Sequence, residues 1–302
     1  MSYNYKGKCF DEIVRLWRNW RKIIDKALES SLSLLPEAKA IDVARYIVEG
    51  GKRFRGFLTI LVAEAFGAEP EAALDAAVAV ELVHAASLAQ DDIIDVDYER
   101  RGHKAAWVVY GVGKTVMVSN LLVPYSQSIV YAKYGVEALA RTVKAWLDIS
   151  RGEVLDAFID PMRLPPTDYT RIARLKTGSL FRLACELGAI AAGAERYIDS
   201  ISAYGEDLGL IYQFADDIVD LALFEKGKLK ILSPSTQLFK RLYKNSKEAI
   251  NRLRQHVAVV AERALSLPFS SRKKLLANLP AFMADAMLRE AGLSLNDSLC
   301  LE

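Results

Sequence analysis

The sequence has little of what a turn-rich or disulfide-built protein needs. Its 302 residues include only 17 glycines and 9 prolines, which disfavours an all-β fold rich in turns and a disordered chain. Its three cysteines are odd in number and widely spaced, at Cys9, Cys185 and Cys300. This spacing argues against a disulfide framework or a structural zinc site, and it suits a reducing compartment, so we expect a cytoplasmic protein.

The chain also lacks a surplus of charge. A formal net charge of +2 gives no basic excess for nucleic acid and no acidic tail. The first residues contain no apolar run of the kind found in a signal peptide, so we expect none. What the chain does have is 52% hydrophobic residues against 26% charged ones, which is enough for a sizeable core.

One apolar stretch, residues 72–90, is about as long as a membrane span. Asp75, Glu81 and His84 interrupt it, and no Lys or Arg flanks its start. A membrane helix and a buried central helix are both open readings. The polar residues favour the buried helix, since such a helix is apolar nearly all round with a few polar positions.

Helical periodicity runs through almost the whole chain. The spacing of apolar residues predicts an amphipathic helix from about residue 13 to 27, and two or three helices after residue 223. Between these it predicts helices at 36–48, 55–66, 70–96, 114–134, 136–159, 167–192 and 195–223. Pro124 is expected to kink its helix, and Thr167 or Asp168 to cap another. We find no alternating run that predicts a strand and no linker, so we expect one all-α domain over 1–302.

Two aspartate groups are the strongest chemical signal. Asp91, Asp92 and Asp95 end the apolar stretch as DDIID, and Asp216, Asp217 and Asp220 repeat the arrangement as DDIVD. Carboxylates at i and i+4 share a helix face about 6 Å apart along the axis, and they repel unless a cation lies between them. Magnesium prefers one or two carboxylates plus phosphate oxygens. One such group alone would more often be a solvated helix end, but two favour a multi-metal site for a diphosphate.

Short basic segments accompany the aspartates. GGKRFRG carries Lys52, Arg53 and Arg55, two further arginines follow the first aspartate group, and RLKTGSLF carries Lys176 and Thr177. Each segment alone is typical of a solvated face. Together with two aspartate groups they indicate fixed cations for diphosphate.

These motifs, in this order and spacing, resemble those of the trans-isoprenyl diphosphate synthases, or polyprenyl synthetases. The similar stretches are GGKRFRG, ELVHAASLAQDDIIDVDYERRG, KTGSLF and GLIYQFADDIVDL. The resemblance implies a bundle of long antiparallel helices around a deep apolar cavity (the isoprenoid synthase fold), usually as a homodimer. It also implies a reaction, the head-to-tail condensation of an allylic diphosphate with isopentenyl diphosphate.

The resemblance further implies a role for each matching residue. Two magnesium ions on the allylic diphosphate would be held by Asp91, Asp92 and Asp95, and a third by Asp216, Asp217 and Asp220. Arg100, Lys176 and Gln213 would contact the allylic diphosphate, and Lys52, Arg55, His84 and Arg101 would bind isopentenyl diphosphate. Thr177 and Gln213 would offer oxygen dipoles to the allylic cation. Taken alone, His84 would more often be a hydrogen-bonded core histidine.

Product length is expected to depend on the two small residues one turn before the first aspartate group, Ala86 and Ser87. Shorter-chain members resembling this chain carry bulky aromatics there as the pocket floor. Small residues leave the floor open and predict geranylgeranyl diphosphate or longer, about twenty to thirty carbons. Tyr125 and Tyr131 could set a deeper floor.

The sequence departs from the family pattern after the second aspartate group. The expected lysine loop is replaced by DLALFEKGKLKILSPST, in which Lys226, Lys228 or Lys230 could substitute. Two other readings stay open. A terpene cyclase would carry a different second motif, which is absent, and a non-catalytic subunit of a heteromeric synthase would carry damaged aspartates, whereas both groups are intact.

Overall fold

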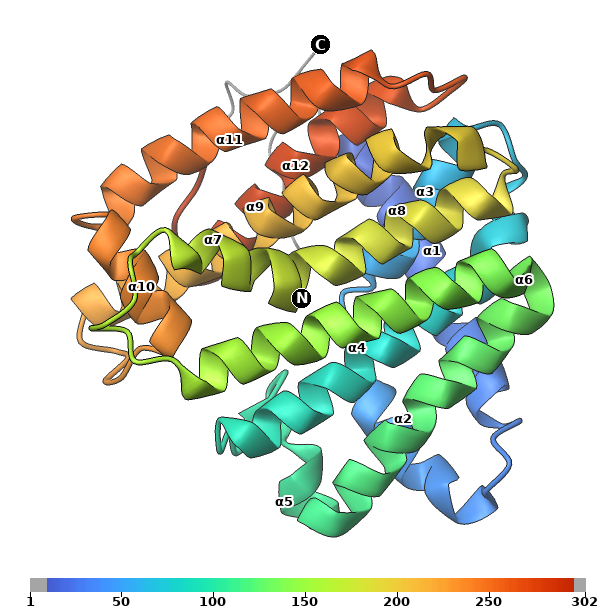
Figure 1. Ribbon diagram of the computed structural model, residues 1–302, viewed down its shortest axis with the longest axis horizontal. Helices are drawn as coiled ribbons and strands as arrows, with labels where there is room; N and C mark the ends of the chain where they lie inside the picture. The colour runs from blue at the N-terminus through green and yellow to red at the C-terminus, as the bar shows by residue number, and fades with distance from the viewer. Residues whose placement is uncertain (1–9, 296–302) are drawn as a thin grey trace. The chain divides into compact units, whose positions relative to one another are not determined.

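The computed structural model describes residues 10–295, and these are helical almost throughout (Figure 1). This confirms the all-α expectation. Cys185 is buried with a free thiol, while Cys9 and Cys300 lie outside the described residues. The long helices are α1 (Asp11–Leu32), α2 (Ile41–Val48), α3 (Phe54–Ala65), α4 (Leu74–Ile94), α6 (Val112–Phe158), α8 (Ser179–Ala191), α9 (Ile198–Glu225), α10 (Pro234–Leu242), α11 (Ser246–Ser266) and α12 (Lys273–Leu288).

Shorter elements connect these helices. They are α5 (Ala106–Tyr110), α7 (Asp168–Ala173), the π-helical turn η3 (Arg174–Gly178) and the 3-10 turns η1 (Ala38–Ala40), η2 (Pro70–Ala73), η4 (Glu195–Tyr197) and η5 (Arg289–Ala291). The chain divides into two compact units. Within the described residues, unit 1 comprises 10–16, Asp148–Arg182 and 199–295, and unit 2 comprises Trp17–Leu147 and Leu183–Ile198.

Unit 2 is built around the packing of α3 against α4. Both helices are apolar on most sides, and nearly all of α3 is buried. Within the described residues, one helical stretch, Pro70–Ile94, is apolar and long enough to cross a membrane, and 67% of its most apolar window is buried. Such burial is what the buried-helix reading of this stretch predicts.

A small hairpin follows α4, where we expected no strand. β1 (Glu99–Arg100) pairs antiparallel with β2 (His103–Lys104), and Arg100 lies opposite His103. The two turn residues, Arg101 and Gly102, have φ values of 56° and 80°. Positive φ at both central positions is the mark of a type I′ turn, the turn whose twist suits a two-residue hairpin. Strands of two residues are too short to leave an alternating pattern in the sequence.

The two helices expected at 114–134 and 136–159 are the two segments of α6. The helical backbone is interrupted at Gly135, whose φ of 81° and ψ of −169° are outside the helical range. Pro124, where we expected a kink, lies within the first segment. The interruption therefore falls on the residue that adopts positive φ most easily.

Unit 1 contains the C-terminal helices and the segment that carries KTGSLF. α11 packs along α12, α12 is buried along its length, and α10 packs against α7. The helix expected at 167–192 is three consecutive elements, α7, η3 and α8. Thr167 occupies the N-cap position of α7, although its side chain makes no capping hydrogen bond.

Candidate functional site

The first aspartate group occupies the last turn of α4 in unit 2. Asp92 is only 3% exposed, and its Oδ1 accepts a hydrogen bond of 2.6 Å from Arg100 Nε. Arg100 Nη2 also pairs with Asp97 Oδ2 at 3.1 Å. Burial raises the pKa of Asp92, and the Arg100 hydrogen bond opposes that rise. Asp91 is half-buried and Asp95 is exposed at the C-cap.

The chain turns sharply after Asp95. Val96 has a φ of 57°, and Asp97 N donates to Asp92 O at 2.9 Å, the long hydrogen bond of a Schellman motif. Glycine usually takes this position, because a β-branched residue at positive φ is strained. Backbone strain of this kind is typical of functional sites.

The basic segment lies in the same unit. Arg55 Nη1 and His84 Nε2 are 3.1 Å apart, and Arg101 Nη1 donates to Glu49 O at 2.5 Å. Burial and the charges of the surrounding arginines, Arg55 foremost, lower the pKa of His84 well below its usual value. The imidazole is therefore neutral near pH 7, and its Nε2 accepts from Arg55. The structure thus brings together Arg55 and His84, two of the four residues expected to bind one diphosphate.

A pocket of about 160 Å³ lies beside this segment. Its lining includes Glu49, Gly50, Ala85, Asp92, Arg100 and Arg101. Arg100 and Arg101 are neighbours in sequence, yet they engage different partners, Asp92 and Glu49 O. The type I′ turn explains this, because Arg100 ends a strand and Arg101 begins the reversal.

The second aspartate group lies in the C-terminal part of α9, in unit 1. Asp217 is 2% exposed. Its Oδ2 accepts from Tyr169 OH at 2.7 Å and from Gln213 Nε2 at 3.1 Å, and its Oδ1 accepts from Thr236 Oγ1 at 2.6 Å. Burial raises the pKa of Asp217 to about 6, although these three donors act against the rise. Asp216 and Asp220 are half-buried.

Gln213 and Thr177 are also brought together in unit 1. Thr177 Oγ1 donates to Gln213 Oε1 at 2.6 Å. The amide of Gln213 therefore joins Thr177 to Asp217. This is a continuous polar connection between KTGSLF and the second aspartate group.

Lys176 lies in the π-helical turn η3, and two acidic side chains of α6 meet it. Its Nζ is 2.9 Å from Glu153 Oε2 and 3.0 Å from Asp156 Oδ2. Asp156 is buried and also accepts from Ser235 N at 3.0 Å. π-helical turns inside helices are frequent at functional sites.

Glycines allow Lys176 to come so close to α6. A Cβ at Gly152 would lie 2.5 Å from Lys176 N, and a Cβ at Gly209 would lie 2.6 Å from Gly178 Cα. Contacts this short have no room for a side chain. Both glycines are therefore required where η3 meets α6 and α9.

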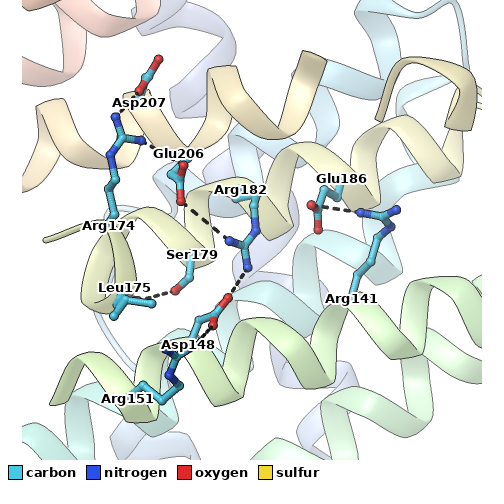
Figure 2. A network of polar contacts seen from close by, with 10 residues as sticks. All are labelled: Arg141, Asp148, Arg151, Arg174, Leu175, Ser179, Arg182, Glu186, Glu206 and Asp207. Atoms are coloured by element: carbon cyan, nitrogen blue, oxygen red, sulfur yellow. Dashed lines mark hydrogen bonds and ion pairs between the residues drawn. The ribbon is translucent and has the colours of Figure 1, made fainter. Parts of the chain in front are cut away.

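Figure 2 shows the ion pairs that hold this region of unit 1. Arg174 of η3 reaches Glu206 and Asp207 of α9, each at 2.9 Å, and Arg182 of α8 reaches Asp148 of α6 at 2.8 Å. Asp148 is 4% exposed in its side chain. These partly buried pairs connect the turn that carries Lys176 to α9, and α8 to α6.

Four residues of this region were missed in the sequence. Glu153 and Asp156, one helical turn apart in RGEVLDAF, carried a weak signal, because paired carboxylates on one helix face suit a basic partner. Tyr169 and Thr236 carried none, since their hydrogen bonds to Asp217 join residues 48 and 19 positions apart.

The donor set suits magnesium better than a self-contained metal cage. Within residues 10–295, no group of three or more His, Cys, Asp or Glu side chains is arranged to hold a metal ion. Each aspartate group instead offers one or two carboxylates. Magnesium is bound in this way when waters and substrate phosphates complete its octahedral shell.

The remaining predicted residues are placed as follows. Ala86 is fully buried, and Ser87 is half-buried with its Oγ donating to His84 O at 2.9 Å. Tyr125 OH donates to Ser31 O at 2.6 Å, whereas Tyr131 is 58% exposed. Lys226 Nζ donates to Ala291 O at 3.4 Å, and Lys226, Lys228 and Lys230 are all exposed.

Comparisons with known proteins identify the family that the chain resembles. The family model described as polyprenyl synthetase matches residues 37–233. Hexaprenyl pyrophosphate synthase of Saccharolobus solfataricus is 34% identical over 93% of this chain and 98% of its own. Geranylfarnesyl diphosphate synthase of Methanosarcina mazei is 29% identical over 82% of this chain and 85% of its own.

Solved structures share the fold. Geranylgeranyl pyrophosphate synthetase from Pyrococcus horikoshii superposes with a TM-score of 0.77 at 24% identity, covering 91% of this chain and 99% of that one. Decaprenyl diphosphate synthase from Rhodobacter capsulatus has a TM-score of 0.77 at 21% identity, covering 90% and 98%. These matches confirm the expected all-α isoprenoid synthase fold.

Proposed function

The chain belongs to the polyprenyl synthetase family of trans-prenyltransferases, and from that premise we propose that it condenses isopentenyl diphosphate head-to-tail with an allylic diphosphate. The observation that carries the proposal is the presence of both aspartate groups with all three basic segments intact. The product is a trans-polyprenyl diphosphate, and free diphosphate is released. The family match runs through segments of both units, which supports one catalytic domain over 1–302.

The family uses Mg²⁺, and we assign three ions to the proposed site. Two would be held by Asp91, Asp92 and Asp95, and the third by Asp216, Asp217 and Asp220. When bound, magnesium stabilises the negative charge that develops on the departing diphosphate. Asp217 also accepts three hydrogen bonds from protein donors, so its metal contact stays a prediction.

The residues around the allylic substrate divide the work. Arg100 and Lys176 contact its diphosphate as fixed cations, which stabilises the leaving group without reorganisation. Thr177 and Gln213 direct oxygen dipoles at the allylic cation, and their mutual hydrogen bond of 2.6 Å holds both in place. No side chain is assigned as general base, and released diphosphate accepts the proton.

Isopentenyl diphosphate would bind to Lys52, Arg55, His84 and Arg101 in unit 2. The neutral imidazole of His84 orients the Arg55 guanidinium by accepting from Nη1. A bound diphosphate gains most from donors that are already oriented, because less conformational freedom is lost on binding.

The product is geranylgeranyl diphosphate or longer, about twenty to thirty carbons, because Ala86 and Ser87 leave the proposed chain path open. Two of the similar proteins are named for hexaprenyl and geranylfarnesyl products, in keeping with this range. Neither alternative is favoured. Both aspartate groups are intact, unlike those of a non-catalytic subunit, and the second lacks the terpene cyclase pattern.

We propose a cytoplasmic homodimer. Support comes from exposed apolar side chains that recur at seven- and four-residue intervals along α6: Val136, Val143, Leu147, Val154 and Phe158. Intervals of seven and four are those of a helix-packing seam. Replacing Val143 and Leu147 by Glu should shift the sedimentation profile from dimer to monomer, and an unchanged dimer would place the interface elsewhere.

One assay tests the proposed function. The purified protein is incubated with Mg²⁺, isopentenyl diphosphate and labelled farnesyl or geranylgeranyl diphosphate, and the products are separated by chromatography. Elongated prenyl diphosphates are expected. Cyclised hydrocarbons would instead indicate a terpene cyclase, and absence of turnover without another chain would indicate a subunit of a heteromeric synthase.

A further inference from the structure

Arg53 has no role in the proposed reaction, yet it is a buried charged residue of GGKRFRG. It is 4% exposed and lies between Lys52 and Arg55, the two cations assigned to isopentenyl diphosphate. Its φ of 57° places it in the left-handed region, at the N-cap of α3. A non-glycine residue persists there only when its surroundings hold it.

Three groups of unit 2 hold the Arg53 guanidinium. Nε donates to Asp25 Oδ1 at 2.7 Å, Nη2 donates to Val48 O at 2.7 Å, and Nη1 lies 3.5 Å from Glu81 Oε2. The three partners come from α1, the end of α2 and α4. Arg53 therefore connects the basic segment to three separate helices.

Glu81 extends the connection to the start of α3. It is 1% exposed, and its Oε1 accepts from Gly56 N at 2.8 Å. The carboxylate thus pairs with Arg53 and also satisfies a first-turn N–H of α3, where negative charge is favourable. On the other side of Arg53, Trp17 Nε1 donates to Lys52 O at 2.7 Å.

The same guanidinium limits the space around Gly51, the residue before Lys52. A Cβ at Gly51 would lie 2.7 Å from Arg53 Nη1 and 3.3 Å from Arg101 Nη2. The backbone at Gly51 therefore lies directly against two guanidiniums, one buried and one assigned to substrate. The Arg53 guanidinium therefore leaves no room for a side chain at this position.

We propose that Arg53 is a positioning residue for isopentenyl diphosphate: through Asp25, Val48 O and Glu81 it fixes the Gly51–Gly56 turn, so that Lys52 and Arg55 meet the diphosphate in a preset geometry. The inference deepens the proposed function and depends on its assignment of Lys52 and Arg55. It separates the three basic residues of one short motif into two that touch the substrate and one that orients them.

Calorimetric titration of the Mg²⁺-loaded protein with isopentenyl diphosphate alone tests this, together with steady-state kinetics for both substrates. Arg53→Met retains much of the side-chain length but removes the guanidinium. It is paired with Glu81→Gln, which keeps an oxygen for Gly56 N and leaves no buried charge alone. We expect the Kd and KM for isopentenyl diphosphate to rise about tenfold, because small misplacements of binding groups are costly. The allylic KM and kcat at saturating isopentenyl diphosphate should stay within about twofold.

Two controls separate positioning from general loosening. Arg45→Met removes another arginine of unit 2, on α2, which pairs with Glu29 and Asp42. It should change neither the Kd for isopentenyl diphosphate nor the KM of either substrate. Ile24→Ala removes a fully buried side chain that reaches the same turn, where its Cδ1 lies 3.2 Å from a Cβ built on Gly56. It should lower the melting temperature without a selective rise in the isopentenyl Kd.

Equal effects of the Arg53 variant on both substrates, no effect on either, or the same selective loss in Ile24→Ala would overturn the inference. If the wild-type protein binds isopentenyl diphosphate but does not condense it, the proposed function is contradicted. The Kd ratio of variant to wild type would still decide the role of Arg53. If the wild-type protein does not bind isopentenyl diphosphate, both the proposed function and the role of Arg53 are contradicted.

Discussion

The two aspartate groups have the same sequence pattern but different surroundings. In the first, the buried member Asp92 is paired with a cation, Arg100, and the group occupies the exposed end of α4. In the second, the buried member Asp217 lies inside α9 and is surrounded by the neutral donors Tyr169, Gln213 and Thr236. Burial raises the pKa of both carboxyls, and that of Asp217 reaches about 6.

This difference shows that the pattern specifies a face of a helix rather than an electrostatic environment. In the first group, the hydrogen bond and charge of Arg100 oppose the rise in the pKa of Asp92 that burial causes. In the second group only neutral hydroxyl and amide donors oppose the effect of burial, and the pKa of Asp217 is raised to about 6. The first group is therefore expected to act through an ion-paired carboxylate, and the second to be held as part of an internal hydrogen-bond network.

The largest expected effect is shared by the two groups. Asp91→Asn and Asp216→Asn should each lower kcat by about 100- to 1,000-fold, since each removes a proposed magnesium ligand that stabilises the leaving group. Product formation at saturating Mg²⁺ measures this. Asp75→Asn, an exposed carboxylate at the start of α4 that pairs with Lys133, is the matched control and should retain full activity. A loss confined to one aspartate group would mean that only that group holds metal.

Substitutions on α4 and on α9 should differ in their effect on product length. Ala86 of α4 and Ile211 of α9 both lie five positions before their aspartate group, and both are buried. Ala86→Phe should shorten the product by at least one isoprene unit, because the ring closes the proposed chain path, and the smaller change Ala86→Met should do so partially. Ile211→Phe should leave the product length unchanged. Chromatography of the products decides, and shortening by both phenylalanines would show that α4 has no special role.

Much of the molecule was predictable from local pattern. The end of α2 before Gly50 and Gly51, the buried α4 and the interruption between the two segments of α6 all followed from periodicity and breakers. The aspartate groups were recognisable because one repeats the other. Local pattern contains no information on which distant side chain completes a buried carboxylate, so Tyr169 and Thr236 were not found. The hairpin was not predicted because its strands are two residues long.

The pH dependence of stability should further distinguish Asp217 from Asp92. The pKa of Asp217 is raised from 3.8 to about 6, so between these values the folded protein binds a proton that the unfolded chain has released. Its contribution to stability is present at low pH and is lost as pH rises through this window, about 3 kcal/mol in all.

The measurement is the free energy of urea unfolding with EDTA, from pH 4 to 7, for wild type and Asp217→Asn. Other carboxylates shift stability in both proteins alike, so the difference between the two curves isolates Asp217. The free energy of unfolding of wild type minus that of Asp217→Asn should fall by up to about 3 kcal/mol as pH rises. Asp92→Asn should give a shallower difference, because Arg100 compensates that charge. Parallel curves for Asp217→Asn would contradict the assigned environment.

The smallest effects concern the two hydroxyl groups that bond Asp217. Tyr169→Phe and Thr236→Val should each lower the free energy of unfolding by about 1–2 kcal/mol at pH 7, since each leaves a buried carboxylate with one donor fewer. At pH 4, where Asp217 is protonated in the folded protein, the loss should be smaller, because a neutral carboxyl depends less on these donors. Thr170→Val, an exposed position beside Tyr169, is the matched control and should change stability by less than about 0.5 kcal/mol. An equal loss at both pH values would mean that the hydroxyls serve packing rather than the charge.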